Sequence, residues 1–217
     1  QNTLFYLLAG TAISLALSTM AAFILSRRHF LLRGVLMKFM MVTMYFSGGL
    51  IPFFLLIRSI GLYNTRWVMI LPYAISTYNV IVMRSFFQSL PPSLEESAVL
   101  DGANDLQVLL WVVVPLSAPV IAVIAMYYGV GYWNSWYPSL IFHRNRQYYP
   151  LQMILREMLI LNEPTEQTTM SEMVDEPYTR ELVKYCAIVL TTVPILAIYP
   201  FLQRYFVKGV MIGAIKG

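Results

Sequence analysis

The chain has 217 residues, of which 58% are hydrophobic and only 12% are charged. A soluble domain carries about 25% charged residues, so this composition excludes a protein whose whole surface faces water. The net charge is +4. No basic patch interleaved with aromatic residues accompanies this charge, so we expect no nucleic-acid partner. An excess of Lys and Arg is instead typical of membrane proteins, which collect basic residues on their cytoplasmic side.

Five apolar stretches are candidates for transmembrane helices. Each approaches the roughly 20 residues that a helix needs to cross a bilayer. None of their cores contains Asp, Glu, Lys, Arg or His. In chain order they run over residues 4–25, 39–57, 67–83, 108–131 and 185–202. The sequence therefore predicts an all-α, polytopic transmembrane helix bundle that forms one domain over residues 1–217.

The distribution of basic residues predicts the orientation of these spans. Loop 26–38 holds four of the chain's basic residues, whereas loop 58–66 holds two. The positive-inside rule places loop 26–38, segment 84–107 and the C-terminus in the cytoplasm. It places Gln1, loop 58–66 and the long segment 132–184 outside, because long loops translocate largely regardless of charge.

Prolines lie within or beside the spans. Proline removes a backbone donor and kinks a helix, and neighbouring helices tolerate such kinks in a membrane. Two interpretations stay open: irregular packing of the bundle, or kinked helices that line a pathway which opens and closes. The residues concerned are Pro52, Pro72, Pro115, Pro119, Pro194 and Pro200.

The segment between the third and fourth spans predicts two short helices with a bend between them. The S-x-x-E pattern of Ser93 and Glu96 is typical of a capping box, so we expect a helix to begin at Ser93. Gly102 then ends or bends that helix. Asn104 or Asp105 caps a second helix that runs into the membrane.

The first of these helices has two interpretations from its residues alone. It is either a well-capped surface helix without a partner or a helix that binds a protein outside the bilayer. In the second case it presents Leu94, Ala98, Val99 and Gly102 to that partner.

The outer segment 132–184 begins with an aromatic cluster. Sugar sites combine aromatic faces with polar groups, so these residues are candidates for a substrate pathway. The alternative is an aromatic belt at the membrane interface. The cluster consists of Tyr132, Trp133, Asn134, Trp136 and Tyr137. Residues 151–161 predict an amphipathic helix. Together with the acidic stretch 162–180, this helix either contacts a receptor protein outside or covers the bundle.

No pattern in the chain predicts bond-breaking chemistry. The phosphate-binding loop G-x-x-x-x-G-K-[ST] is absent from the sequence. His29 and His143 are the only histidines and lie far apart in the sequence. We therefore expect no catalytic residue, no metal site and no cofactor in this subunit.

Three motifs carry a resemblance to a known family. The run Glu96-Ser97-Ala98-x-x-Asp101-Gly102-Ala103, followed by Val113-Val114-Pro115 and Pro119, resembles the EAA loop of permease subunits of binding-protein-dependent ABC importers. Ser97 departs from the alanine that is usual there. Residues 203–209 and 213–217 resemble the C-terminus of carbohydrate permeases of the maltose type. The outer segment 132–184 resembles a subgroup of these permeases that handles complex oligosaccharides. The run W-N-S-W-Y-P at 133–138 is the third match.

The resemblance implies a type I ABC importer permease in a bacterial cytoplasmic membrane. Members commonly have six spans, so one span is expected to be missing before Gln1. The helix at 93–105 then couples to a cytoplasmic ATPase through Glu95, Glu96, Ser97, Ala98, Asp101, Gly102 and Ala103. The resemblance also implies a second permease in a heterodimer, two ATPase copies that bind ATP and Mg, an extracellular solute-binding protein, surrounding lipid and a carbohydrate substrate.

Three other functions compete with this one. The first is a permease of the same fold for another solute, such as amino acids or phosphate. The second is an ion- or proton-coupled secondary transporter, which normally places ionisable residues at membrane depth. The third is an intramembrane enzyme, which needs polar catalytic groups within the spans. The uncharged span cores argue against the last two.

Overall fold

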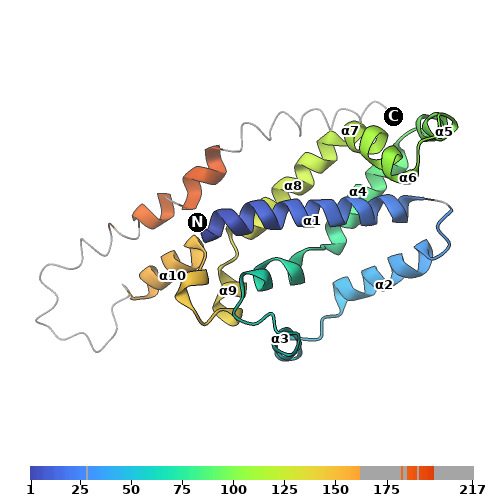
Figure 1. The fold of residues 1–217 in the computed structure, drawn as a ribbon. Helices are drawn as coiled ribbons and strands as arrows, with labels where there is room; N and C mark the ends of the chain where they lie inside the picture. Colours follow the sequence, from blue (N-terminus) through green and yellow to red (C-terminus); the bar gives the residue numbers. More distant parts are fainter. Residues whose placement is uncertain (28, 162–181, 183–184, 190, 198–217) are drawn as a thin grey trace, which may run out of the picture.

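The computed structural model describes residues 1–27, 29–161, 182, 185–189 and 191–197. These residues form helices and turns, with no strand among them. The long helix α1 (Asn2–Ser26) lies at the centre and packs along α8 (Ala118–Trp133) and α4 (Thr77–Ser89) (Figure 1). The all-α bundle predicted from the sequence is confirmed, and the first span, predicted over 4–25, is this continuous helix.

Small residues let α1 approach α8 closely. Gly10, Ser14 and Ser18 recur every four residues and so lie on one face of α1. The Ser14 hydroxyl shares a hydrogen bond of 2.8 Å with the Tyr132 hydroxyl, and Ser18 shares one of 2.6 Å with Tyr128. A Cβ atom on Gly10 would lie 2.6 Å from the Tyr132 ring. Close packing of small residues and interhelical hydrogen bonds are the forces that associate helices in a membrane.

The second predicted span, 39–57, is wrong as a straight helix. The chain forms α2 (Arg33–Tyr45) and α3 (Leu50–Ser59), which meet at an angle of 117°. Gly49 lies between them with a φ of 84°, a conformation that residues with a side chain rarely adopt. A glycine pair at the bend, followed by Pro52 in the first turn of α3, ends one helix and starts the next.

The third predicted span, 67–83, is also broken. Its first part forms the 3-10 turns η1 (Arg66–Met69) and η2 (Leu71–Tyr73), and the regular helix α4 begins only at Thr77. The Tyr128 hydroxyl accepts a hydrogen bond of 2.9 Å from the Ser76 N–H, just before α4. Irregular backbone is tolerated at membrane depth where neighbouring helices supply such bonds.

The fourth predicted span, 108–131, bends by 87° at Ser117. It comprises the first turn α6 (Asp105–Gln107), the π-helix η3 (Val108–Val113), the short α7 (Val114–Leu116) and then α8. Proline lacks the N–H that would continue the helical hydrogen bonds, and π-bulges are a common cause of kinks. Pro115 and Pro119 flank the bend, so the prolines predicted to interrupt the bundle do lie at one of its breaks.

The fifth predicted span, 185–202, is partly described. Residues 185–189 and 191–197 are helical, and residues 198–202 lie outside the described residues. By length and composition, α1 is the one unbroken helix among the described residues that is long and apolar enough to cross a membrane. The number of such crossings rises to three if each bent pair counts as one.

The helices α5 (Pro92–Leu100) and α6 lie near the end of α1, whereas α9 (Trp136–Phe142) and α10 (Leu151–Leu161) lie near its beginning (Figure 1). At one end, Arg84 Nε donates a hydrogen bond of 2.9 Å to the Leu25 carbonyl, which joins the last turn of α1 to the start of segment 84–107. At the other end, the Asn64 N–H donates to the Phe142 carbonyl at 3.0 Å. For the described residues, this grouping agrees with the one predicted from basic residues. The side of the membrane that each end faces stays a prediction.

Three further elements complete the second of these ends. They are α9 (Trp136–Phe142), the 3-10 turn η4 (Arg146–Tyr148) and α10 (Leu151–Leu161). The predicted helix at 151–161 is α10 and is confirmed. The acidic stretch 162–180 and the tail motifs at 203–217 lie outside the described residues.

Candidate functional site

The candidate coupling helix is α5 (Pro92–Leu100). It begins at Pro92, one residue before the predicted start, and the predicted capping box of Ser93 and Glu96 is wrong: no side chain caps this helix. Proline is preorganised for the first helical position, so Ser93 falls inside the first turn and cannot act as the cap. Its carbonyl instead accepts a hydrogen bond of 2.8 Å from the Ser97 hydroxyl.

The end of α5 is a Schellman motif centred on Gly102. The Ala103 N–H donates to the Ala98 carbonyl and the Gly102 N–H donates to the Val99 carbonyl, each at 3.0 Å. Gly102 has a φ of 85°, which this motif requires and which glycine adopts without strain. The predicted bend at Gly102 is confirmed.

A capping box starts the helix that follows, and it lies at Asn104. The Asn104 side chain accepts a hydrogen bond from the Gln107 N–H at 2.9 Å, and the Gln107 side chain accepts one from the Asn104 N–H at 2.8 Å. Of the two residues predicted to cap this helix, Asn104 does so and Asp105 is its first residue.

The coupling helix leaves an apolar surface without a partner in the described part of the chain. No residue of α5 is buried. The exposed fractions of Leu94, Val99 and Leu100 are 43%, 57% and 87%. Ala98 is half-buried and packs against the core, so of the residues predicted to face a partner, Ala98 faces the bundle instead. A Cβ atom on Gly102 would meet nothing within 4 Å.

The acidic residues of this motif differ in their surroundings. Glu96 and Asp101 are exposed, whereas Glu95 is half-buried and forms an ion pair with Arg27, just beyond the end of α1. Sequence reasoning missed both Leu100 and Arg27. The sequence does indicate Leu100, because this apolar residue directly follows Val99 in the last turn of the helix. Arg27 had none, because its partner lies in a distant segment.

The residues of the predicted aromatic cluster differ in their surroundings. Tyr132 is buried against α1, and Trp133 Nε1 donates a hydrogen bond of 3.2 Å to the Thr191 carbonyl. The guanidinium of Arg156, on α10, lies 4.4 Å from the centre of the Trp136 ring. Asn134 and Tyr137 are exposed. Three of the five residues are therefore engaged within the chain, and two present free side-chain surface.

A buried histidine connects three segments at the end of the bundle that contains α9. His143 is 4% exposed, and its ring stacks on Tyr6. Its Nε2 lies 3.1 Å from the Thr65 carbonyl and its Nδ1 lies 3.0 Å from the Ser139 hydroxyl. A carbonyl cannot donate, so Nε2 carries the proton and the hydroxyl donates to Nδ1. Burial lowers the pKa of His143 below its usual 6.5, and the bond to Thr65 only partly opposes that change.

This geometry predicts that the fold loses stability in mild acid. The unfolded chain binds a proton at His143 below pH 6.5 and the folded chain does not, so the unfolding free energy falls as the pH drops from 6.5 toward the lower pKa of the folded state. Melting curves of the purified protein at about pH 7.5 and about pH 5.5 measure the effect. The variant His143→Gln, which cannot titrate, should show a smaller difference between the two curves. An equal shift of the melting temperature between the two pH values in both proteins would show that His143 is not the cause.

The apolar helix bundle defines a class, an integral membrane protein whose helix α5 is exposed at one end. Residues 14–138 match the family described as the binding-protein-dependent transport system inner membrane component. The chain belongs to this family, so it is the permease subunit of an ATP-driven ABC importer and not itself an enzyme. It is a membrane protein.

Two relatives and one solved structure show how far the similarity extends. The chain is 42% identical over 216 residues to the polygalacturonan/rhamnogalacturonan transport system permease protein YtcP of Bacillus subtilis (strain 168), covering 99% of this chain and 75% of that protein. It is 41% identical to Protein LplC of the same organism, covering 99% and 72%. A chain from the crystal structure of a bacterial ABC transporter involved in the import of the acidic polysaccharide alginate aligns with a TM-score of 0.86 and 34% identity, covering 94% of this chain and 73% of that one.

Proposed function

We propose that this permease forms half of the translocation pathway for an oligosaccharide derived from an acidic polysaccharide. Similar proteins support this substrate class: one relative is named for polygalacturonan and rhamnogalacturonan, and the similar structure for alginate. Galacturonan and alginate are both polymers of uronic acids. The membrane is a bacterial cytoplasmic membrane, which the protein crosses several times.

The coupling part of the proposal rests on the exposed helix α5. Its apolar residues face outward in the described structure, and its Schellman motif gives it a fixed end. A short helix of this kind suits a groove on a partner protein. The proposed partner is a cytoplasmic ABC ATPase, present in two copies that bind ATP and Mg. Of the motif residues, the proposed contacts are the exposed ones, Glu96, Ser97, Asp101 and Gly102, to which we add Leu94, Val99 and Leu100. Glu95 pairs with Arg27, and Ala98 and Ala103 pack against the core, so these three position the helix instead.

The remaining subunits follow from the same assignment. A second permease completes the pathway as a heterodimer, and an extracellular solute-binding protein delivers the sugar. Lipid surrounds the bundle. Along the pathway we propose the cluster of Tyr132, Trp133, Asn134, Trp136 and Tyr137. Within it, Asn134 and Tyr137 are the members whose exposed side chains are free to contact a substrate.

ATP hydrolysis by the whole complex tests the substrate class. The complex is purified through a tag on this chain and reconstituted in lipid vesicles together with its binding protein. We expect oligogalacturonate or oligoalginate to stimulate hydrolysis and neutral maltooligosaccharides to do so weakly. Stimulation by amino acids or phosphate, with no response to any sugar, would contradict the proposal and support a permease of the same fold for another solute.

A further inference from the structure

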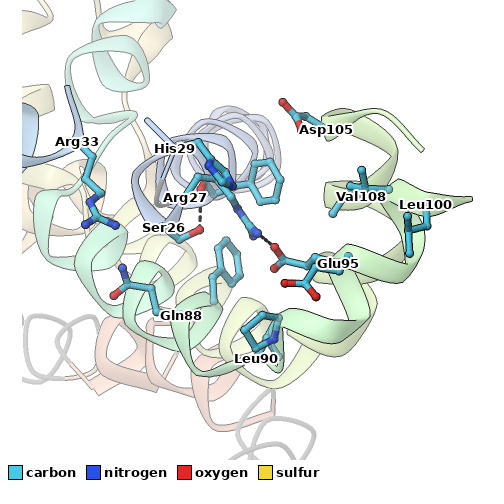
Figure 2. A pocket seen from close by; sticks show the side chains of 15 residues that line it. Ser26, Arg27, His29, Arg33, Gln88, Leu90, Glu95, Leu100, Asp105 and Val108 are labelled. Carbon is cyan, nitrogen blue, oxygen red and sulfur yellow. Dashed lines mark hydrogen bonds and ion pairs between the residues drawn. The ribbon is translucent and has the colours of Figure 1, made fainter. Parts of the chain in front are cut away.

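A single arginine joins the end of α1 to the coupling helix. Arg27 is the residue that follows α1, and its guanidinium lies 4.1 Å from the centre of the Phe23 ring on that helix. The same guanidinium forms an ion pair with Glu95 on α5 (Figure 2). Both side chains are largely shielded from water, with exposed fractions of 22% and 21%. A partly buried pair is screened less by salt than one on an open surface.

The coupling helix has few other attachments to the central helices. α5 packs on the π-helix η3, the segment that leads into α8. Within the described part of the chain, no hydrogen bond joins α5 to α1, so the ion pair is their direct polar connection. Because none of the residues of α5 is buried, packing alone does not fix its position relative to α1.

The end of α1 is itself held firmly. Arg84, on α4, donates through Nε to the Leu25 carbonyl at 2.9 Å. α1 then packs along both α4 and α8 over most of its length (Figure 1). A displacement passed to Arg27 therefore reaches the helix that contacts the two other main helices of the bundle.

We propose that the ion pair of Arg27 and Glu95 is a transmission link that passes movement of the coupling helix to α1. This inference rests on the proposed docking of α5 on an ATPase and adds a positioning role for Arg27, which lies outside the EAA motif. The ATPase moves α5 through the exposed apolar residues. The ion pair carries that movement into α1, while η3 carries it into α8.

The cavity beside the pair allows the link to stay engaged while α5 moves. It measures about 1000 Å³ and lies between the end of α1, the end of α4 and α5 (Figure 2). Glu96 and Asp105 also line it. Arg27 Nε and Nη2 are buried without an acceptor among the described residues, so the guanidinium has donors available for either carboxylate. Burial lowers the pKa of Arg27 and the Asp105 charge raises it, and the guanidinium remains charged.

Variants of the pair in the reconstituted complex test the link. Glu95→Gln and Arg27→Met each remove the ion pair. We expect the ATPase to copurify normally and basal hydrolysis to persist, while the amount of sugar imported per ATP falls by about tenfold, within the range of typical coupling between sites. The exchange Arg27→Glu with Glu95→Arg restores the pair and should recover most of that loss.

Two parallel variants separate this inference from the proposal on which it rests. Arg33→Met removes a positive charge that lines the same cavity and forms no ion pair among the described residues, and it should behave like the wild type. Leu100→Glu places a charge on the most exposed apolar residue of α5 and should prevent copurification of the ATPase, which the variants of the ion pair should not do. Normal import per ATP in both single variants overturns the link, as does loss of copurification in either of them. Normal copurification with Leu100→Glu overturns the docking proposal instead.

Discussion

Replacing Gly102 with leucine is expected to abolish sugar import and leave the helix bundle folded. Gly102 has a φ of 85° and lies at the end of α5, where an added Cβ atom would have no neighbour within 4 Å. A bulky side chain there protrudes from the proposed contact surface and holds the ATPase away. We expect copurification of the ATPase to fall by about 30-fold or more, which corresponds to the loss of about 2 kcal/mol at the centre of an interface.

A second glycine provides a matched control for this substitution. Gly61 has a φ of 75° and is equally open, but it lies at the opposite end of the bundle. Both leucine variants carry the same backbone strain, about 1–2 kcal/mol for a residue in this conformation. The proposal requires similar melting temperatures for the two variants and loss of import for Gly102→Leu alone. Import at the wild-type rate by Gly102→Leu would contradict the assignment of α5 as the coupling helix.

Replacing Gly10 with leucine is expected to prevent folding of the bundle. The Tyr132 ring occupies the space of a side chain at Gly10, at 2.6 Å from the Cβ position, and it is buried with its hydroxyl bonded to Ser14. Even alanine is too large for this contact. We expect Gly10→Ala to cost about 1–3 kcal/mol, the usual range for an overpacked core, and Gly10→Leu to leave no folded protein in detergent extracts.

Two further variants show whether the clash with Tyr132 is the cause. Gly131→Ala, at an open position on α8, adds the same methyl group without a neighbour within 4 Å and should leave the melting temperature nearly unchanged. Tyr132→Ala removes the ring. Combined with Gly10→Ala, it should cost less than the sum of the two single changes, because contacting residues couple. Additive losses would show that Gly10 matters for another reason.

The sequence predicted the helical class and the continuous first span, and it failed at the breaks in the later spans. Hydropathy identifies apolar stretches by averaging over about 19 residues and does not detect a bend inside one. The breaks at Gly49 and Ser117 have local signals in glycine and proline, which predict kinks but not their angles. The late start of α4 depends on the Tyr128 hydroxyl, which bonds the Ser76 N–H from another helix.

The coupling segment shows the same division between local and distant causes. Gly102 and Asn104 were predicted correctly because caps are set by residues within one turn. Ser93 was assigned wrongly because Pro92 took the first helical position. The Arg27–Glu95 pair was not predictable, since nothing in a single sequence shows which distant segments meet. For the same reason, the neighbours that Trp133 and Trp136 contact were not foreseen.

The paired serines of α1 have a consequence for synthesis of the protein. Ser14 and Ser18 precede their tyrosine partners by 118 and 110 residues. At about 5–20 residues per second, the ribosome makes α8 roughly 5 to 25 s after α1. During that interval the two hydroxyls meet no partner from α8, and a serine in a helix then bonds to the carbonyl four residues earlier. Insertion of α8 replaces those temporary bonds with the interhelical bonds to Tyr132 and Tyr128. The final hydrogen bonds of Ser14 and Ser18 therefore form only after α8 has been made.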